Sequence, residues 1–156
     1  MDKTTLTVLI LLFFLVAFVS GCSSTSDEIW TGTDVLNTNY FNSGYQFIIY
    51  LHGKIIEDEG LNAIHPDYGR YEYNEILVYL ASSGGQIISE IRPAGTDPIA
   101  YAEKGAVWIN HLLDHGVPPQ KIFVIGFSKG GAITIHLSDH LKNPGINYVL
   151  IGICSD

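Results

Sequence analysis

The sequence predicts an α/β protein, a three-layer α/β/α sandwich built around a mostly parallel sheet. Between residues 46 and 154, strand-like and helix-like patterns alternate, beginning and ending with a strand. Strands that are separated by helices join a parallel sheet through right-handed crossovers, which place helices on both faces. We find no internal repeat and no second domain in this order of elements.

Four short apolar runs bounded by turn residues are predicted to be the strands. The first extends from Gln46 to Leu51 between Gly44 and Gly53 and is typical of a strand buried on both faces. Residues 29–43 carry weaker strand signals, which fit either one edge hairpin or an irregular lead-in. The other strands are predicted at 86–91, 121–127 and 148–154.

Three helices are predicted from the spacing of apolar residues and from their end signals. Residues 72–81 place apolar side chains at helical spacing and end in a Ser-Ser-Gly-Gly turn. The second helix has Pro98 in its first turn, with Thr96 or Asp97 as the cap, and ends before two consecutive prolines. The third helix covers 130–141.

The beginning of the chain is typical of an export signal. Lys3 precedes an almost unbroken apolar run at 6–19, and small residues follow that run. The run is shorter than the roughly 20 residues that a membrane-spanning helix needs. The polar residues 23–28 are typical of a flexible tether. We therefore expect a removable signal, while a true anchor helix is the alternative.

The end of this signal predicts the location of the protein. Val-Ser-Gly-Cys at 19–22 resembles a bacterial lipobox, in which the cysteine is diacylated and becomes the N-terminus. A lipidated Cys22 would hold the exported protein at an envelope membrane, the outer membrane where the organism has one. An ordinary secreted protein with an incidental Cys22 is the alternative. The predicted parts are a lipoprotein signal peptide at 1–21, a tether and lead-in at 22–43, and one domain at 44–156.

Charge and motif content argue against several classes of function. The chain has 16 acidic residues and 8 lysines and arginines, a formal net charge of −8, and no basic cluster. Nucleic acid is therefore not expected as a partner. No Cys-x-x-Cys, His-Glu-x-x-His or calcium-loop pattern is present, so no metal site is expected. No glycine-rich phosphate loop follows a strand, and no cofactor is predicted.

The segment Gly126-Phe127-Ser128-Lys129-Gly130 connects the third predicted strand to the third helix. A serine hydroxyl is a poor nucleophile near neutral pH and needs exposure, a base and stabilisation of the oxyanion. A sharp strand-to-helix turn lifts the hydroxyl out of the sheet, but side chains two positions away would collide. Glycine at 126 and 130 meets this requirement and predicts Ser128 as a nucleophile. The alternative is a glycine-rich crossover turn with an incidental serine.

A second turn is predicted at the same edge of the sheet. Leu51-His52-Gly53-Lys54 directly follows the first strand, and binding sites gather at the carboxyl ends of parallel strands. We expect His52 to brace this turn rather than to accept protons.

The sequence resembles the α/β-hydrolase superfamily, in its serine esterase, lipase and peptidase group. The resemblance rests on three features: the first strand with its His-Gly turn, the segment at 116–122, and the strand-to-helix turn at 126–130, called the elbow below. The resemblance covers about residues 44–156 and implies a partial α/β-hydrolase fold. It implies attack by Ser128 on a small-molecule or lipid ester, thioester or amide. It also implies that the backbone N–H groups of Lys54 and Lys129 form the oxyanion hole, with Gly53 as the alternative to Lys54.

The resemblance further implies an acid and a histidine that follow the nucleophile in the chain. Asp156, directly after the fourth strand, is the candidate acid. The only histidines after Ser128 are His136 and His140, on the helix that leaves the elbow. His136 is eight residues along, roughly 12 Å at 1.5 Å per residue, and cannot reach the serine hydroxyl. His65, in a long polar loop at 54–71, is a remote candidate for the base.

The missing histidine leaves two functions open. The first is a membrane-anchored serine hydrolase that is impaired in this chain. We expect such a chain to be a truncated gene product, whose full-length form supplies the histidine. The second is a non-catalytic membrane-anchored lipoprotein that uses the hydrolase fold as a binding module.

Overall fold

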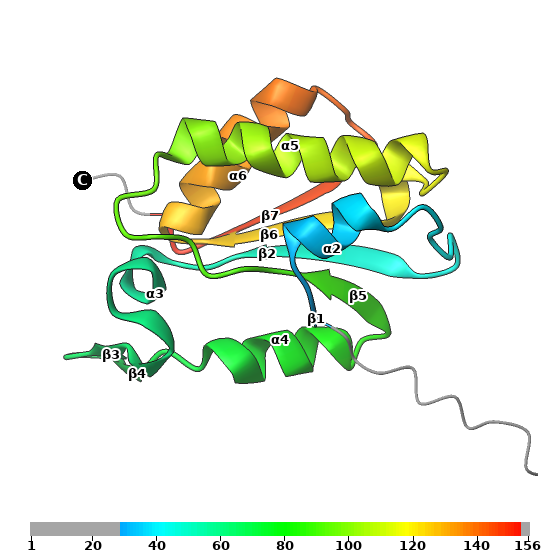
Figure 1. Ribbon diagram of the computed structural model, residues 1–156. Helices are drawn as coiled ribbons and strands as arrows, with labels where there is room; N and C mark the ends of the chain where they lie inside the picture. The colour runs from blue at the N-terminus through cyan, green and yellow to red at the C-terminus, as the bar shows by residue number, and fades with distance from the viewer. Residues whose placement is uncertain (1–28, 154–156) are drawn as a thin grey trace, which may run out of the picture.

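The computed structural model describes residues 29–153, which build one parallel sheet with helices packed against it (Figure 1). All five strands of this sheet run parallel, in the spatial order β1-β5-β2-β6-β7. The α/β class and the parallel sheet are therefore confirmed. The strands are β1 (Ile29–Trp30), β2 (Gln46–Leu51), β5 (Gly85–Ile88), β6 (Ile122–Phe127) and β7 (Asn147–Ile151).

The register of the central strands determines where the candidate site lies. Strand β2 pairs with β6 so that Leu51, the last residue of β2, lies opposite Gly126, one residue before β6 ends at Phe127. The turn after β2 and the turn after β6 therefore emerge side by side. A buried strand with partners on both sides gives both turns a rigid base, and five of the six residues of β2 are buried.

Helices lie on both faces of the sheet (Figure 1). On one face, α2 (Gly32–Asn37), α5 (Pro98–Asp114) and α6 (Lys129–Leu141) cover a core that includes Ile49, Trp108 and Ile133. On the other face, α3 (Lys54–Glu59) and α4 (Tyr73–Ala81) contribute to a second core around Ile48, Ile56 and Leu77. Burial of these apolar side chains is the main driving force that holds the helices to the sheet.

Most of the predicted elements are present with small shifts at their ends. The first strand has the predicted bounds, and helix α5 begins at Pro98 with Asp97 as its cap, since the Asp97 carboxylate accepts from the N–H groups of Ile99 and Ala100. Strand β5 ends at Ile88, before the predicted end at 91, because its pairing with β1 and its pairing with β2 both stop at this residue.

Two segments differ from what their sequence suggests. Residues 29–43, expected to form a hairpin or an irregular lead-in, contribute the parallel edge strand β1 and helix α2. The Thr31 hydroxyl caps α2, and Gly32 packs so closely against the Trp108 ring that a side chain would overlap it. Close packing against α5 therefore fixes a segment that carries little pattern of its own.

The predicted loop at 54–71 is also more ordered than expected. It contains α3, a short 3₁₀ helix (Gly60–Asn62), and an antiparallel hairpin of β3 (Ile64–His65) and β4 (Gly69–Arg70). These elements are too short for apolar periodicity to reveal them.

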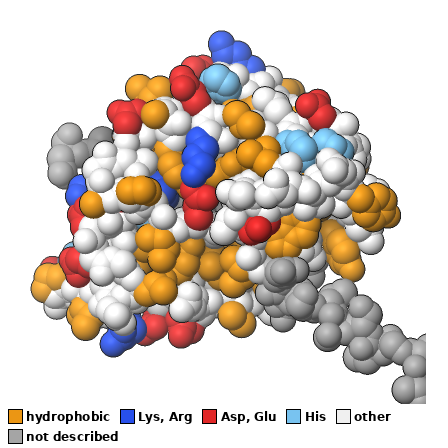
Figure 2. Space-filling view, in the orientation of Figure 1, with side chains coloured by type: hydrophobic (Ala, Val, Ile, Leu, Met, Phe, Trp, Pro, Cys, Tyr) orange, Lys and Arg blue, Asp and Glu red, His pale blue; other side chains and the backbone are white. Residues whose placement is uncertain are grey.

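The surface is mixed in character. Figure 2 shows hydrophobic side chains gathered over the lower part of the visible face, the part where Figure 1 places α4. Helix α4 exposes Val78 and Tyr79, and the edge strand β7 exposes Val149, Leu150 and Ile151. Among the described residues, no helix has both the length and the hydropathy to cross a membrane. The predicted signal at 1–21, Cys22 and Asp156 lie outside the described residues.

Candidate active site

Ser128 lies at the sharp turn between β6 and α6 and has an unusual backbone conformation. Its φ of 52° and ψ of −118° fall in a region that non-glycine residues rarely adopt. Its N–H donates to the carbonyl of Ile151 at 2.9 Å, and its carbonyl accepts from the N–H of Gly131 at 2.8 Å. Such strain costs about 1–3 kcal/mol and persists only where the surrounding structure imposes it. Backbone hydrogen bonds on both sides impose it here.

The glycines on either side of Ser128 occupy places with no room for a side chain. A Cβ at Gly126 would overlap the Gly130 carbonyl and the Thr134 hydroxyl. A Cβ at Gly130 would overlap the carbonyl of Leu51 on the neighbouring strand. Because several of these obstacles are backbone atoms, rotation of a side chain cannot relieve them. The crowding expected from the sequence is therefore present at both positions.

The turn after β2 passes directly beside the elbow. A Cβ built at Gly53 would lie 3.6 Å from the Cβ of Ser128 and 3.0 Å from Cδ1 of Phe127. Lys54 and Lys129 are the first residues of α3 and α6, so their N–H groups have no acceptor within the helix. The Gly53 N–H, in contrast, donates to the Tyr71 hydroxyl at 3.4 Å. Of the two N–H groups considered for the oxyanion hole in this turn, that of Gly53 is therefore already engaged, which favours that of Lys54.

His52 is fully buried, and both of its ring nitrogens are engaged. Nε2 accepts from the N–H of Arg92 at 3.0 Å, so the proton lies on Nδ1, which donates to the Gly53 carbonyl at 2.8 Å. Burial, together with the charge of Arg92, lowers the pKa of His52 to about 4. A neutral imidazole with both nitrogens occupied braces the turn and is not placed to take a proton from Ser128.

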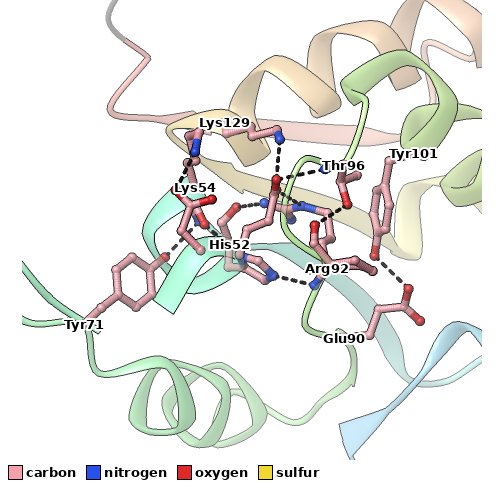
Figure 3. A network of polar contacts seen from close by, with 12 residues as sticks. His52, Lys54, Tyr71, Glu90, Arg92, Thr96, Tyr101 and Lys129 are labelled. Atoms are coloured by element: carbon pink, nitrogen blue, oxygen red, sulfur yellow. Dashed lines mark hydrogen bonds and ion pairs between the residues drawn. The ribbon is translucent and has the colours of Figure 1, made fainter. Parts of the chain in front are cut away.

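A buried carboxylate links this turn to the elbow, and nothing in the sequence pattern indicated it. Glu57, on α3, accepts from Lys129 Nζ at 2.6 Å, from Arg92 Nε at 3.3 Å and from the Thr96 N–H at 3.0 Å. The side chains of Glu57 and Arg92 have no exposed surface. Figure 3 shows Lys129 and Arg92 reaching the same carboxylate from different segments. Arg92 Nη2 also donates to the carbonyl of His52.

The charges around Glu57 determine its ionisation. Burial alone would raise the pKa of Glu57, but hydrogen bonds and charges from Lys129 and Arg92 outweigh burial and hold that pKa below its usual range. Glu57 is therefore a carboxylate at neutral pH.

The other histidines lie away from the elbow. His65 packs against Tyr68 in the β3–β4 hairpin, with ring centroids 4.7 Å apart, and its Nδ1 accepts from the N–H of Asp67. Within residues 29–153, no hydrogen bond joins the Ser128 hydroxyl to a histidine. In the described part of the chain, Ser128 therefore lies beside Gly53, Lys54 and Lys129, and no histidine is hydrogen-bonded to its hydroxyl. The remaining histidines are His111 and His115 near the end of α5, and His136 and His140, exposed on α6.

An apolar hollow of about 370 Å³ adjoins the elbow on the α4 side of the sheet. Strands β2, β6 and β7 form its floor and α4 forms a wall. Tyr71 and Phe127 belong both to the hollow and to the surroundings of Gly53. The only polar side-chain groups of its lining residues are the hydroxyls of Tyr50 and Tyr71, which hydrogen-bond to each other at 2.6 Å. It is lined by Tyr50, Tyr71, Ile76, Leu80, Ile125, Phe127, Val149 and Ile151.

Comparison with protein families, with curated proteins and with solved structures finds no match. The geometry of the elbow and its surroundings is therefore what bears on function.

Replacing Gly130 with alanine should destabilise the fold by about 3 kcal/mol, because the new methyl group meets backbone that cannot move without separating α6 from β2. Urea denaturation would measure the change. Asp139→Ala, at an exposed position of the same helix, should change the free energy of unfolding by less than about 0.5 kcal/mol. Equal losses in the two variants would contradict the close contact.

Burial of a neutral His52 should make stability depend on pH. The unfolded residue protonates near pH 6.5, whereas the folded one stays neutral down to about pH 4. The unfolded state therefore binds more protons in this window. The free energy of unfolding should fall as the pH drops from 6.5 to 4, by up to about 1.4 kcal/mol per pH unit from this group.

The matched pair His52→Asn and His136→Asn tests this origin through denaturation midpoints measured between pH 4 and 7. His52→Asn should flatten the slope, whereas the exposed His136→Asn should keep it. A slope that survives unchanged in His52→Asn would assign the pH dependence to another group.

Proposed function

We propose that this protein is a serine hydrolase of the α/β-hydrolase type, with the strands and helices forming part of a three-layer α/β/α sandwich. The observation that carries the proposal is the backbone of Ser128, held at a positive φ between two glycines that admit no side chain. A strained serine between a parallel strand and a helix is what a nucleophile elbow requires. The adjoining Gly53–Lys54 turn supports the same role.

The proposed reaction begins with attack of Ser128 Oγ on the carbonyl carbon of an ester, thioester or amide. The carbonyl π electrons move to oxygen, and the N–H groups of Lys129 and Lys54 stabilise that oxyanion. The tetrahedral intermediate collapses with loss of an alcohol, thiol or amine, and leaves an acyl-serine. Water then releases the acid and restores Ser128.

The proton of Ser128 needs an acceptor that these residues do not provide. The six histidines of the sequence are paired or placed elsewhere, so in this proposal a longer form of the protein supplies the histidine. Asp156 as the acid and Cys22 as the lipid anchor at an envelope membrane stay predictions. Without the base, the oxyanion hole and substrate binding still leave some residual catalysis.

The hollow beside Phe127 supports a substrate with an apolar acyl group. Its two hydroxyls are already paired with each other, so a polar or charged group would lose hydrogen bonds to water without replacement. A hydrocarbon chain loses none and gains from leaving water.

The second candidate is a binding module that holds an apolar ligand without turnover. The engagement of His52 by Gly53 and Arg92 favours it, because the histidine nearest the turn cannot act as a base. Reactivity of Ser128 separates the two candidates.

The mature chain, which lacks the predicted signal at 1–21, should react slowly with an alkyl fluorophosphonate, and Ser128 should be the one residue modified. Intact mass and peptide mapping would measure this reaction. Added imidazole should accelerate this reaction by about tenfold or more, because a correctly positioned general base contributes about 100-fold or more. Ser128→Ala should not react, whereas Ser138→Ala should react normally. Apolar ligand binding without phosphonylation of Ser128, at any imidazole concentration, would favour the binding module.

An octyl fluorophosphonate should react with Ser128 at least about tenfold faster than an ethyl one at equal subsaturating concentrations. Each buried methylene contributes about 0.8 kcal/mol, so burial of about two of the additional methylenes is enough for this factor. Leu80→Trp, which fills the hollow from α4, should remove this preference. Val78→Trp, at an exposed position of the same helix, should retain it. A preference that survives Leu80→Trp would place the alkyl chain elsewhere.

A further inference from the structure

Glu57 is a fully buried carboxylate that the proposed reaction does not use. It lies one turn of helix beyond Lys54 and has three donors around it: Lys129 Nζ, Arg92 Nε and the backbone N–H of Thr96. A carboxylate taken out of water is tolerated only when such partners compensate for its lost hydration. The site therefore contains a charge that must be held in one arrangement.

The partners of Glu57 come from separate segments of the chain (Figure 3). Lys129 directly follows Ser128 and begins α6, whereas Arg92 and Thr96 belong to the connection between β5 and α5. Arg92 also holds the turn after β2 at two points, because its Nη2 donates to the His52 carbonyl and its backbone N–H donates to the His52 ring. Glu57 thus connects the elbow to the turn, both directly and through Arg92.

The energetics of buried ion pairs indicate what this cluster provides. A buried pair seldom stabilises a fold more than apolar side chains of similar volume would, although removal of one partner is costly. A buried pair does fix the relative position of its partners, because each hydrogen bond restrains an angle as well as a distance. The exposed pair of Lys54 and Asp58 on the same helix lacks this constraint, since both side chains are open to solvent.

We propose that Glu57 is a positioning residue, which fixes the spacing between the N–H groups of Lys129 and Lys54 by tying the elbow to the turn after β2. This inference rests on the proposed function of Ser128. Loss of the carboxylate charge removes the ion pairs that hold Lys129 and Arg92 in place. The N–H groups of Lys129 and Lys54 are then no longer aligned with the oxyanion. Glu57 itself touches neither the substrate nor the reacting atoms.

The test compares Glu57→Gln with Asp58→Asn in the mature chain, using phosphonylation of Ser128 by an alkyl fluorophosphonate at saturating imidazole. Glu57→Gln should lower the maximal rate about tenfold and leave the half-saturating probe concentration within about twofold, since misaligned donors weaken the transition state alone. Asp58→Asn should leave both within about twofold of the unmodified chain. A fall in thermal stability with an unchanged maximal rate would show a merely structural role.

A second measurement is independent of reactivity. In ¹⁵N-labelled protein, Glu57→Gln should shift the amide resonances of Lys54 and Lys129 and speed their hydrogen exchange, with little change at Val124 in the middle of β6. If Ser128 of the unmodified chain does not react, the proposed function fails, and the amides still test the link. Unchanged amides and an unchanged rate in Glu57→Gln would overturn the inference.

Lys129→Met covers the case in which Glu57→Gln does not fold. It removes one partner at the edge of the cluster, where the lysine side chain is 16% exposed, and keeps the Arg92 pair. The maximal rate should fall in the same way, without a matching change in half-saturation. A folded Lys129→Met with the rate and the Lys54 amide of the unmodified chain would contradict the proposed link.

Discussion

The candidate site depends on the contact between Gly130 and the carbonyl of Leu51. Strands β2 and β6 end within one residue of each other because Leu51 pairs with Gly126, and α6 then starts so near β2 that position 130 has no space for a Cβ. This contact holds Ser128 beside Gly53. A larger residue would separate α6 from β2, and Ser128 from the turn after β2, at the same time. Backbone packing therefore sets the basic geometry, before any side chain contributes.

The elements that the sequence predicts well are those whose requirements are local. Strand β2 is a single apolar run between glycines, and the start of α5 follows from Pro98 and the Asp97 cap. The elbow belongs to the same class, because its steric demand falls on two positions of the same short segment. Helix α3 was missed because its six residues are too few to show a period, and its Gly53 cap makes no side-chain hydrogen bond.

The rest of the site arises from contacts between distant positions. Glu57 lies 35 residues from Arg92 and 72 from Lys129, so no local window contains the cluster. Charged residues are also mostly exposed in proteins, so the sequence alone predicts that Glu57, Arg92 and Lys129 lie in solvent. The hollow follows the same logic, since it needs β2, β6, β7, α4 and Tyr71 together. Patterns in a single sequence do not predict which distant residues complement one another in charge and shape.

The polar groups around the elbow hold backbone rather than move protons. His52 is neutral and occupied at both nitrogens, Arg92 clamps the carbonyl of His52, and Glu57 holds Lys129. Each interaction restrains the position of an N–H group or of Ser128, and none offers a lone pair to the serine proton. In the proposed reaction, placement of Ser128 and stabilisation of the oxyanion are thus physically separable from proton transfer. A base brought to this edge by another segment would find the electrostatic part of the site already arranged, which is the part that usually contributes most to catalysis.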